Sequence, residues 1–140
     1  MTIFGEWIVE AAKVANRNAV EHGFWDDPKD FGTTIALFHS EVSEAFDEYR
    51  DGRGMHETYF KCPEHGNLEP GKVSERRDDG TFRCRMCWEV AKPEGIPTEL
   101  ADILIRVLDY VGQHKIDIVT AGNDKHAYNV TRPHKHGRVV

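Results

Sequence analysis

Apolar residues recur every three or four positions in four separate stretches of the 140-residue chain. This spacing is typical of the buried side of an amphipathic helix. We therefore predict four helices, over residues 2–22, from Thr33 or Thr34 to about Arg50, over 98–113 and over 117–131. Gly23 and Pro133 follow two of these stretches as helix stops, and Pro97 suits a first helical turn.

The helical period disappears between residues 55 and 90, where Cys, His, Pro, Gly and charged residues dominate. We read this stretch as an insertion between the second and third helices. The predicted fold is all-α: a four-helix bundle from residues 1–54 and 91–140, with a small zinc-knuckle or ribbon insertion at 55–90. Long surface insertions of this kind cost little loop entropy.

Composition narrows the class of protein. Hydrophobic residues make up 39% and charged residues 30% of the chain, which is typical of a globular protein. No apolar run approaches the roughly 18 residues of a membrane span, and the N-terminus does not resemble a signal peptide. We therefore expect a cytoplasmic protein without a membrane partner. The net charge of −6 disfavours a general nucleic-acid-binding surface.

The insertion contains two pairs of metal-ligating residues, Cys62-x2-His65 and Cys84-x2-Cys87, with 18 residues between them. Thiolate and imidazole ligands at this spacing match a closed tetrahedral zinc site, which would be structural. Two alternatives are a redox pair, for which no βαβ context exists, and ordinary buried thiols. Four aromatic residues flank the ligands and are the predicted miniature core: Tyr59, Phe60, Phe82 and Trp88.

Two acidic pairs, Glu41-x-x-Glu44 and Glu99-x-x-Asp102, lie in the predicted second and third helices. Residues three apart share a helix face, and each pair lies beside an apolar stripe. The two stripes are Val42, Ala45, Phe46 and Tyr49, and Leu100, Ile103, Leu104, Val107 and Val111. If the stripes pack together, four carboxylates converge, and they either point to water or bind hard cations. The alternatives are a solvated helix face and, for the second pair, stabilisation of a helix N-terminus.

Three segments together resemble the MazG-like branch of the all-α nucleoside triphosphate pyrophosphatases. They are H-S-E-V-S-E-A-F-D-E-Y-R, P-T-E-L-A-D-I-L-I-R-V-L-D and K-H-A-Y-N-V-T-R-P-H-K-H-G. The 54 residues between the two acidic motifs exceed the gap usual in that family. Without residues 56–90 this gap would contain 19 residues, a length that fits the family.

The resemblance implies hydrolysis of a nucleoside triphosphate, with a dNTP favoured, to the monophosphate and pyrophosphate. Glu41, Glu44, Glu99 and Asp102 would bind Mg²⁺. Glu44 or Glu41 would also accept a proton from the attacking water, and Glu48 is a candidate outer ligand or a plain surface acid. The family builds its sites within oligomers, so a homodimer or homotetramer is expected.

The substrate-binding residues are also assigned by resemblance. Lys125, Asn129 and Arg132 recur at spacings of four and three, so they share one helix face on which they would grip the triphosphate. A basic helix end that complements the dipole is the alternative. Two residues of the tail, His136 and Arg138, are further candidates for the phosphates. Trp25 is the candidate for stacking on the base, although structural packing explains it equally well.

Two other functions compete with the enzyme. One is a non-catalytic MazG-like module whose zinc insertion contacts a protein or a nucleic acid, because the insertion is rich in basic residues: Lys61, Lys72, Arg76, Arg77, Arg83 and Arg85. The other is a helical adaptor with incidental acids. Four intact motif acids favour the enzyme, and Mg²⁺-dependent release of pyrophosphate would distinguish the three.

Overall fold

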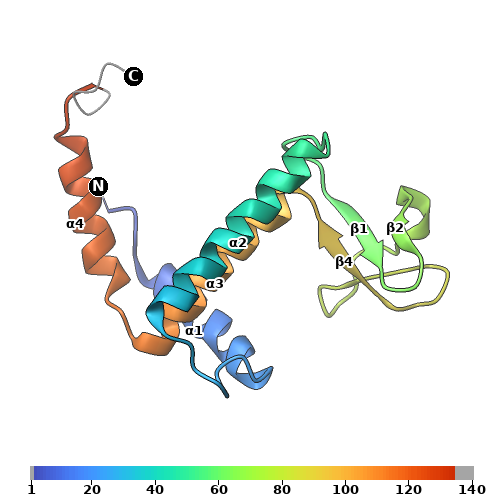
Figure 1. Cartoon of the computed structure of the whole chain (residues 1–140), viewed down its shortest axis with the longest axis horizontal. Coiled ribbons are helices and arrows are strands. Elements are labelled where there is room, and N and C mark those ends of the chain that lie inside the picture. Colours follow the sequence, from blue (N-terminus) through green and yellow to red (C-terminus); the bar gives the residue numbers. More distant parts are fainter. Residues whose placement is uncertain (1, 135–140) are drawn as a thin grey trace. The chain divides into compact units, whose positions relative to one another are not determined.

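The computed structural model describes residues 2–134, which form four α-helices and a four-stranded antiparallel sheet (Figure 1). The helices are α1 (Glu6–Glu21), α2 (Phe31–Arg50), α3 (Ile96–His114) and α4 (Ile118–Val130). The strands are β1 (Tyr59–Cys62), β2 (Gly66–Leu68), β3 (Phe82–Arg83) and β4 (Val90–Glu94), with a 3₁₀ turn, η1 (Pro70–Lys72), after β2. No helix within the described part of the chain is both long enough and apolar enough to cross a membrane.

The prediction of an all-α fold is wrong, because residues 59–94 form a sheet and the protein is therefore mixed α and β. All four helices are present, close to their predicted ranges. The strands contain only two to five residues each, so alternation of apolar and polar residues has too little length to be recognised. α2 also begins at Phe31, before the predicted caps Thr33 and Thr34.

The chain divides into two compact units that differ from the predicted ranges. The first unit combines Met1–Asp30 with Leu104–Val140, and the second is Phe31–Ile103. The second unit therefore contains α2, the whole sheet and the first turns of α3. Each unit is described separately below.

The first unit is held together by contacts between α1, α4 and the later turns of α3. The Asn123 side chain accepts hydrogen bonds from the backbone N–H groups of Ile3 and Phe4, at 3.0 and 3.1 Å, and donates one to the Phe4 carbonyl at 3.0 Å. A side chain at Gly122 would collide with the Phe4 ring, and one at Gly112 would collide with the α1 backbone at Ala12. Close approach of the helices thus requires glycine at these two positions.

The sheet in the second unit has the order β2-β1-β4-β3. Its core combines four buried residues, Cys62, Leu68, Cys84 and Ala91, with four partly buried ones, Phe60, Val73, Phe82 and Cys87. The rings of Phe60 and Phe82 are 4.4 Å apart between centroids, as the predicted miniature core requires. Trp88 was wrongly assigned to this core, since its side chain is 57% exposed.

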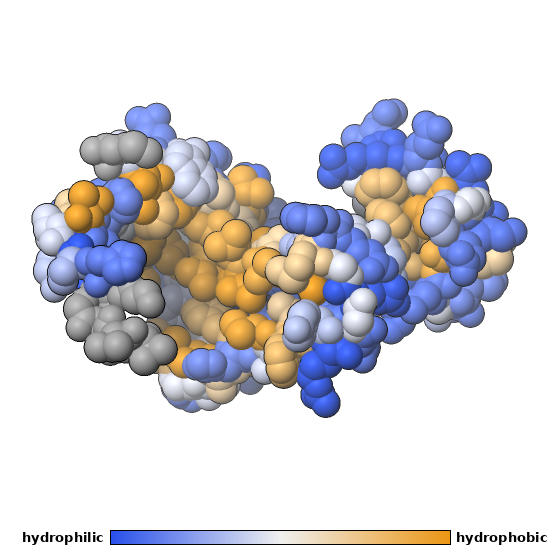
Figure 2. Space-filling view, turned by 90° about the horizontal axis from the view of Figure 1, so that it is seen from above, coloured by the Kyte–Doolittle hydropathy of each residue, from blue (hydrophilic) through white to orange (hydrophobic). Residues whose placement is uncertain are grey.

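The helices of the second unit leave apolar side chains exposed. Val42, Phe46 and Tyr49, which belong to the predicted apolar stripe of α2, are all at least half exposed, and Leu100 of the other stripe is 49% exposed. Figure 2 shows hydrophobic residues gathered on the face that it draws. Within a single chain, these members of the two apolar stripes are therefore left largely uncovered.

Candidate functional site

The four Cys and His residues of the sheet come together in one cluster. One ligand atom from each of Cys62, His65, Cys84 and Cys87 lies within 4.8 Å of the other three. The Cys62 sulfur is 3.4 Å from both His65 Nδ1 and the Cys87 sulfur, and the Cys84 sulfur is 3.8 Å from His65 Nδ1. All three cysteines are free thiols. This cluster can hold a metal ion such as zinc.

Two turns of the sheet supply these ligands. Cys62 ends β1 and pairs with Gly66 in β2, so His65 lies in the intervening turn. Cys84 and Cys87 lie in the turn between β3 and β4, where the Met86 N–H donates to the Cys84 sulfur at 3.4 Å. Tetrahedral ligands at the usual zinc distances are about 3.5–3.8 Å apart, so the observed separations fit that geometry closely.

The second cluster consists of carboxylates from α2, α3 and the end of β4. Carboxylate oxygens of Glu41, Glu99 and Asp102 lie within 4.8 Å of one another, and so do those of Glu48, Glu94 and Glu99. Glu99 belongs to both groups. Three of the four predicted Mg²⁺ ligands are thus brought together by α2 and the first turns of α3.

Glu44, the fourth predicted ligand, belongs to neither carboxylate group among the described residues. Helix geometry explains this difference. Glu41 and Glu48 are seven residues apart and lie on the same face of α2, whereas Glu44 is displaced from Glu41 by about 60° around the helix axis. Its side chain is exposed.

Glu99 is more deeply buried than Glu94, with 2% of its surface exposed against 9%. Burial, and then a hydrogen bond with Glu94, raises the pKa of Glu99 to about 7. Its Oε2 atom is buried and has no hydrogen-bond partner among the described residues. A buried acceptor without a donor is costly, and a bound cation would satisfy it.

Sequence reasoning missed the contribution of β4 to this cluster. Glu94 ends the strand, and the Lys92 ammonium lies 3.1 Å from the Glu94 carboxylate. Burial lowers the pKa of Lys92, but Glu94, Glu99 and Asp102 together raise it above its usual value. Lys92 and Glu94 precede Glu99 by seven and five residues, and this nearness to the E-x-x-D motif is the only sequence signal that could have indicated them.

Glu48 connects the carboxylate cluster to β1. The Tyr59 hydroxyl donates to Glu48 Oε1 at 2.9 Å, and the Arg53 guanidinium is 3.9 Å from Glu48 Oε2. Burial, followed by the bond to Glu48, raises the pKa of Tyr59 to about 12, so this hydroxyl keeps its proton. Tyr59 therefore faces the carboxylates and not the miniature core to which the sequence assigned it.

The predicted phosphate-binding residues lie at the end of α4, in the first unit. Lys125 and Arg132 both approach the exposed Tyr128 ring, at 5.4 and 5.9 Å from its centroid. Asn129 is exposed beside them. The two remaining tail candidates, His136 and Arg138, lie outside the described residues.

Trp25 is part of a polar and aromatic network in the same unit. Its indole N–H donates to Asp109 at 2.8 Å, and its ring contacts Tyr110 and His114. Asn16 donates to the same Asp109 oxygen at 2.9 Å. These contacts favour the packing role for Trp25, and stacking on a base stays a prediction.

Comparison of the chain with protein-family models, with curated proteins and with solved structures finds no match. The resemblance to MazG-like pyrophosphatases therefore rests on the three sequence segments alone. What the protein does must be inferred from its own residues, above all from the two metal-ligating clusters.

Proposed function

We propose that this protein is a Mg²⁺-dependent hydrolase that converts a nucleoside triphosphate, with deoxynucleotides favoured, to the monophosphate and pyrophosphate. Two independent facts support the proposal. The acidic motifs resemble those of a pyrophosphatase family, and three of the four motif acids lie within 4.8 Å of one another.

The observation that carries the proposal is the environment of Glu99. A glutamate that is 98% buried, with a carboxylate oxygen that lacks a donor, is unfavourable in a purely structural helix pair. Glu99 belongs to two groups of three acids, and within each group the carboxylate oxygens lie within 4.8 Å of one another. Hard cations prefer carboxylate oxygens, so a divalent cation would satisfy Glu99 and offset the repulsion between its neighbours.

Each motif acid has a proposed role. Glu41, Glu99 and Asp102 would hold the Mg²⁺, which when bound neutralises phosphate oxygens and makes a water molecule a better nucleophile. Glu44, exposed on the next face of α2, is the proposed acceptor of the proton from that water. Lys92 lies beside the carboxylates and limits their net negative charge before the substrate binds.

The Cys62, His65, Cys84 and Cys87 cluster is proposed to hold a structural Zn²⁺. Four protein ligands fill a tetrahedral zinc site, so no position is left for a substrate or a reacting water. The sheet has a core of few residues, and small cores of this kind usually need a metal or a disulfide. Elemental analysis should find about one zinc per chain, and its absence from freshly purified, chelator-free protein would contradict the assignment.

The exposed apolar side chains of α2 favour a homodimer or homotetramer. Val42, Phe46 and Tyr49 lie within two turns of one helix and are largely exposed in the single chain. Contiguous apolar surface of this kind is typical of an interface, and a second copy would cover it with an identical surface. Sedimentation analysis checks this, and a stable monomer at working concentration would contradict it.

The proposed substrate contacts are Lys125, Asn129 and Arg132 for the triphosphate and Trp25 for the base. Lys125 and Arg132 each lie near the Tyr128 ring, at 5.4 and 5.9 Å from its centroid. Exchange of Arg132 for Gln should raise KM more than it lowers kcat, because its charge contacts the substrate before and during the reaction. An unchanged KM would remove Arg132 from the site.

The decisive experiment is an assay of pyrophosphate release from a panel of canonical and modified dNTPs and NTPs, with and without Mg²⁺. The proposal predicts pyrophosphate and the monophosphate in equal amounts, with activity lost when Mg²⁺ is chelated. Release of inorganic phosphate instead of pyrophosphate, or no turnover of any nucleotide, would overturn it.

A further inference from the structure

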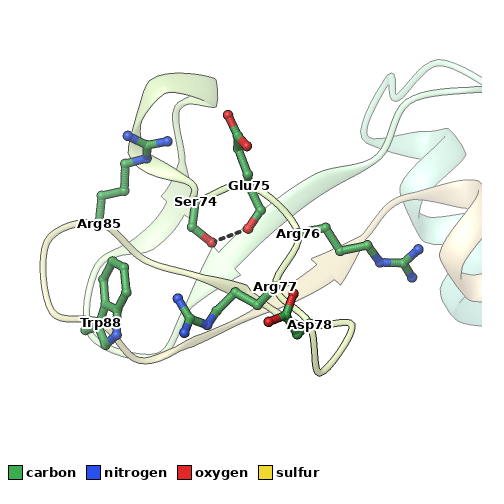
Figure 3. Close-up of a pocket in the computed structure, with 7 residues that line it drawn as sticks. All are labelled: Ser74, Glu75, Arg76, Arg77, Asp78, Arg85 and Trp88. Carbon is green, nitrogen blue, oxygen red and sulfur yellow. Dashed lines mark hydrogen bonds between the residues drawn. The ribbon is translucent and has the colours of Figure 1, made fainter.

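A cavity lies in the sheet module, on residues that the proposed enzyme does not use. Its volume is about 370 Å³, within the usual range of small-molecule sites. Its lining comes from two loops and consists of Ser74, Glu75, Arg76, Arg77, Asp78, Arg85 and Trp88 (Figure 3). Three of these seven side chains are guanidinium groups and one is an indole.

Trp88 is held in an unusual backbone conformation. Its φ of 66° lies in the left-handed region, which favours glycine and is rare for a bulky residue. The conformation is fixed because the Trp88 N–H donates to the Cys84 carbonyl at 2.8 Å and so closes the turn of the Cys/His cluster. A tryptophan kept here with its ring 57% exposed points to a role for the indole face outside the core.

The guanidinium groups are spread along the cavity. Arg77 extends toward the indole, with Cζ 5.5 Å from the ring centroid, whereas Arg76 extends in the opposite direction (Figure 3). Arg85 is held by a 2.7 Å bond from its Nε to the Val73 carbonyl, and Arg76 by a 3.3 Å bond to Gly80. Among residues 2–134, none of the three forms an ion pair with a carboxylate, so their terminal N–H groups stay available to a ligand.

We propose that this cavity binds single-stranded nucleic acid. The Trp88 ring would stack on one unpaired base, and Arg77, Arg85 and Arg76 would contact successive phosphates of the same strand. Aromatic platforms combined with spaced basic groups are how proteins bind single strands without strong sequence preference. A duplex keeps its bases stacked on one another and offers no free face to the indole.

The acidic residues of the cavity favour a nucleic-acid strand over a free nucleotide as the ligand. Glu75 and Asp78 also line it, so the three arginines give a net formal charge of only +1 there. A free triphosphate concentrates its negative charge at one point and would be repelled by both carboxylates. A strand carries one charge per nucleotide, so arginines that extend in different directions, as Arg76 and Arg77 do (Figure 3), could each contact a different phosphate. The site is also local, which is compatible with a chain of net charge −6.

Fluorescence anisotropy with a labelled oligo(dT) of about 16 nucleotides tests the proposal, since single-strand sites span about 4–16 nucleotides. The zinc-loaded full chain is titrated in buffer without divalent cations, so that the carboxylate cluster does not contribute. Binding should weaken as salt rises, because each phosphate contact releases counterions. An absence of oligo(dT) binding would not contradict the proposed hydrolase activity, and an absence of hydrolysis would not contradict this binding site.

Two variants identify the site. Trp88→Gly removes the ring and suits the left-handed backbone, so the turn should persist, and oligo(dT) affinity should fall at least about tenfold. Arg77→Gln should weaken binding and lower the slope of log K against log salt by up to about 0.7. The matched controls are Trp7→Ala and Arg50→Gln, an exposed tryptophan and an exposed arginine outside the cavity, which should bind as the wild type does. Unchanged zinc content shows that each variant has kept the module.

Four results would overturn the proposal. They are an absence of oligo(dT) binding at about 50 mM salt, equal affinity for a duplex of the same length, displacement of oligo(dT) by thymidine monophosphate at matched nucleotide concentration, and unchanged binding by Trp88→Gly with its zinc retained. The third result would show a site for a free nucleotide.

Discussion

The two ligand clusters of the second unit are built from opposite chemistries. The Cys/His cluster takes soft ligands from two turns of a sheet, and all four lie within 4.8 Å. The carboxylate cluster takes hard oxygens from two helices and a strand end, and Glu99 joins two overlapping groups of three. Soft ligands select zinc, whereas carboxylates select Mg²⁺ and similar ions. Donor type therefore separates the two metal functions that we propose for this stretch of chain.

The two clusters also differ in whether their ligand atoms would fill the coordination positions of one metal ion. Four donors complete a tetrahedral site and leave the ion closed to substrate. Glu99 instead keeps an oxygen that has no hydrogen-bond partner among residues 2–134, and it belongs to two groups of carboxylates. A closed site stabilises a fold, and an unsatisfied one can take up ions and substrate. This contrast is the physical basis for our proposal that one cluster has a structural role and the other a catalytic role.

The largest expected effect comes from Cys84→Ser. Cys84 is fully buried in the core of the sheet as well as in the Cys/His cluster. Loss of one thiolate should lower the zinc content from about one per chain to near zero and unfold the sheet, because metal binding and folding of so small a core are coupled. Elemental analysis and amide NMR of residues 59–94 measure both effects.

Met86→Ala is the matched control for Cys84→Ser. Met86 lies in the same turn and is 48% exposed, and only its backbone N–H contacts the Cys84 sulfur. This variant should keep its zinc and its sheet. A Cys84→Ser protein with native amide shifts and no zinc would show that the cluster is not what holds the module together.

Glu99→Gln should act on activity and not on the fold. Replacement of partners that only orient a ligand typically costs 10–100-fold, so removal of a direct ligand should lower pyrophosphate release by at least about a hundredfold. Apparent Mn²⁺ affinity, measured by calorimetry, should fall as well. The metal-free variant should be at least as stable as the wild type, because one acid is taken from a crowded group.

Glu44→Gln distinguishes a role of Glu44 as a metal ligand from a role as the proton acceptor. Glu44 lies outside the carboxylate groups, so this variant should retain Mn²⁺ affinity while its turnover falls. Full activity in both Glu44→Gln and Asp102→Asn would reject the catalytic assignment of the acidic motifs. Loss of Mn²⁺ binding in Glu44→Gln would place Glu44 among the ligands after all.

The sequence was sufficient for those features that repeat at a fixed period or a fixed spacing. All four helices follow from the recurrence of apolar residues, and the Cys/His cluster follows from two x2 spacings. The sheet was not predicted from the sequence, because strands of two to five residues are stabilised by partners distant in sequence, such as Tyr59 opposite Glu94. The error in fold class has this single cause.

The carboxylate site was predictable only in part for a related reason. Glu41, Glu99 and Asp102 were identified from their motifs, but Glu94 and Lys92 reach the cluster through strand pairing, which no local pattern encodes. The apolar stripe of α2 was identified correctly as a stripe. Its partner could not be deduced, because amphipathicity specifies that a face is apolar and does not specify what covers it.

Gly95→Ala tests the connection between the two clusters. Gly95 joins β4 to α3 with a φ of +114°, and a side chain there would collide with the Glu57 carbonyl. Strain of this kind should lower the free energy of unfolding by about 2–3 kcal/mol, as measured by urea denaturation, and should displace Glu94 and Glu99 enough to reduce turnover. Gly71→Ala, where a side chain meets open space, is the control and should be close to neutral. Wild-type activity in Gly95→Ala would show that this turn does not position the acids.

Tyr59→Phe should have the smallest effect and bears on whether the sheet supports the carboxylates at all. The Tyr59 hydroxyl is the donor to Glu48 Oε1, and Glu48 Oε2 is already buried without a hydrogen-bond partner among the described residues. Removal of the hydroxyl should therefore destabilise the protein by about 1–2 kcal/mol, as expected for a lost hydrogen bond to a charged group. Tyr128→Phe, on the exposed side of α4, removes the same atom from solvent and should change the free energy of unfolding by much less. If the two variants are equally stable, Glu48 does not depend on β1.

In that case the zinc module could be excised without loss of hydrolysis, as the 19-residue gap left by removal of 56–90 suggests. If only Tyr59→Phe is destabilised, excision of 56–90 should impair the acids, since it removes the donor to Glu48 and the strand that pairs with Glu94.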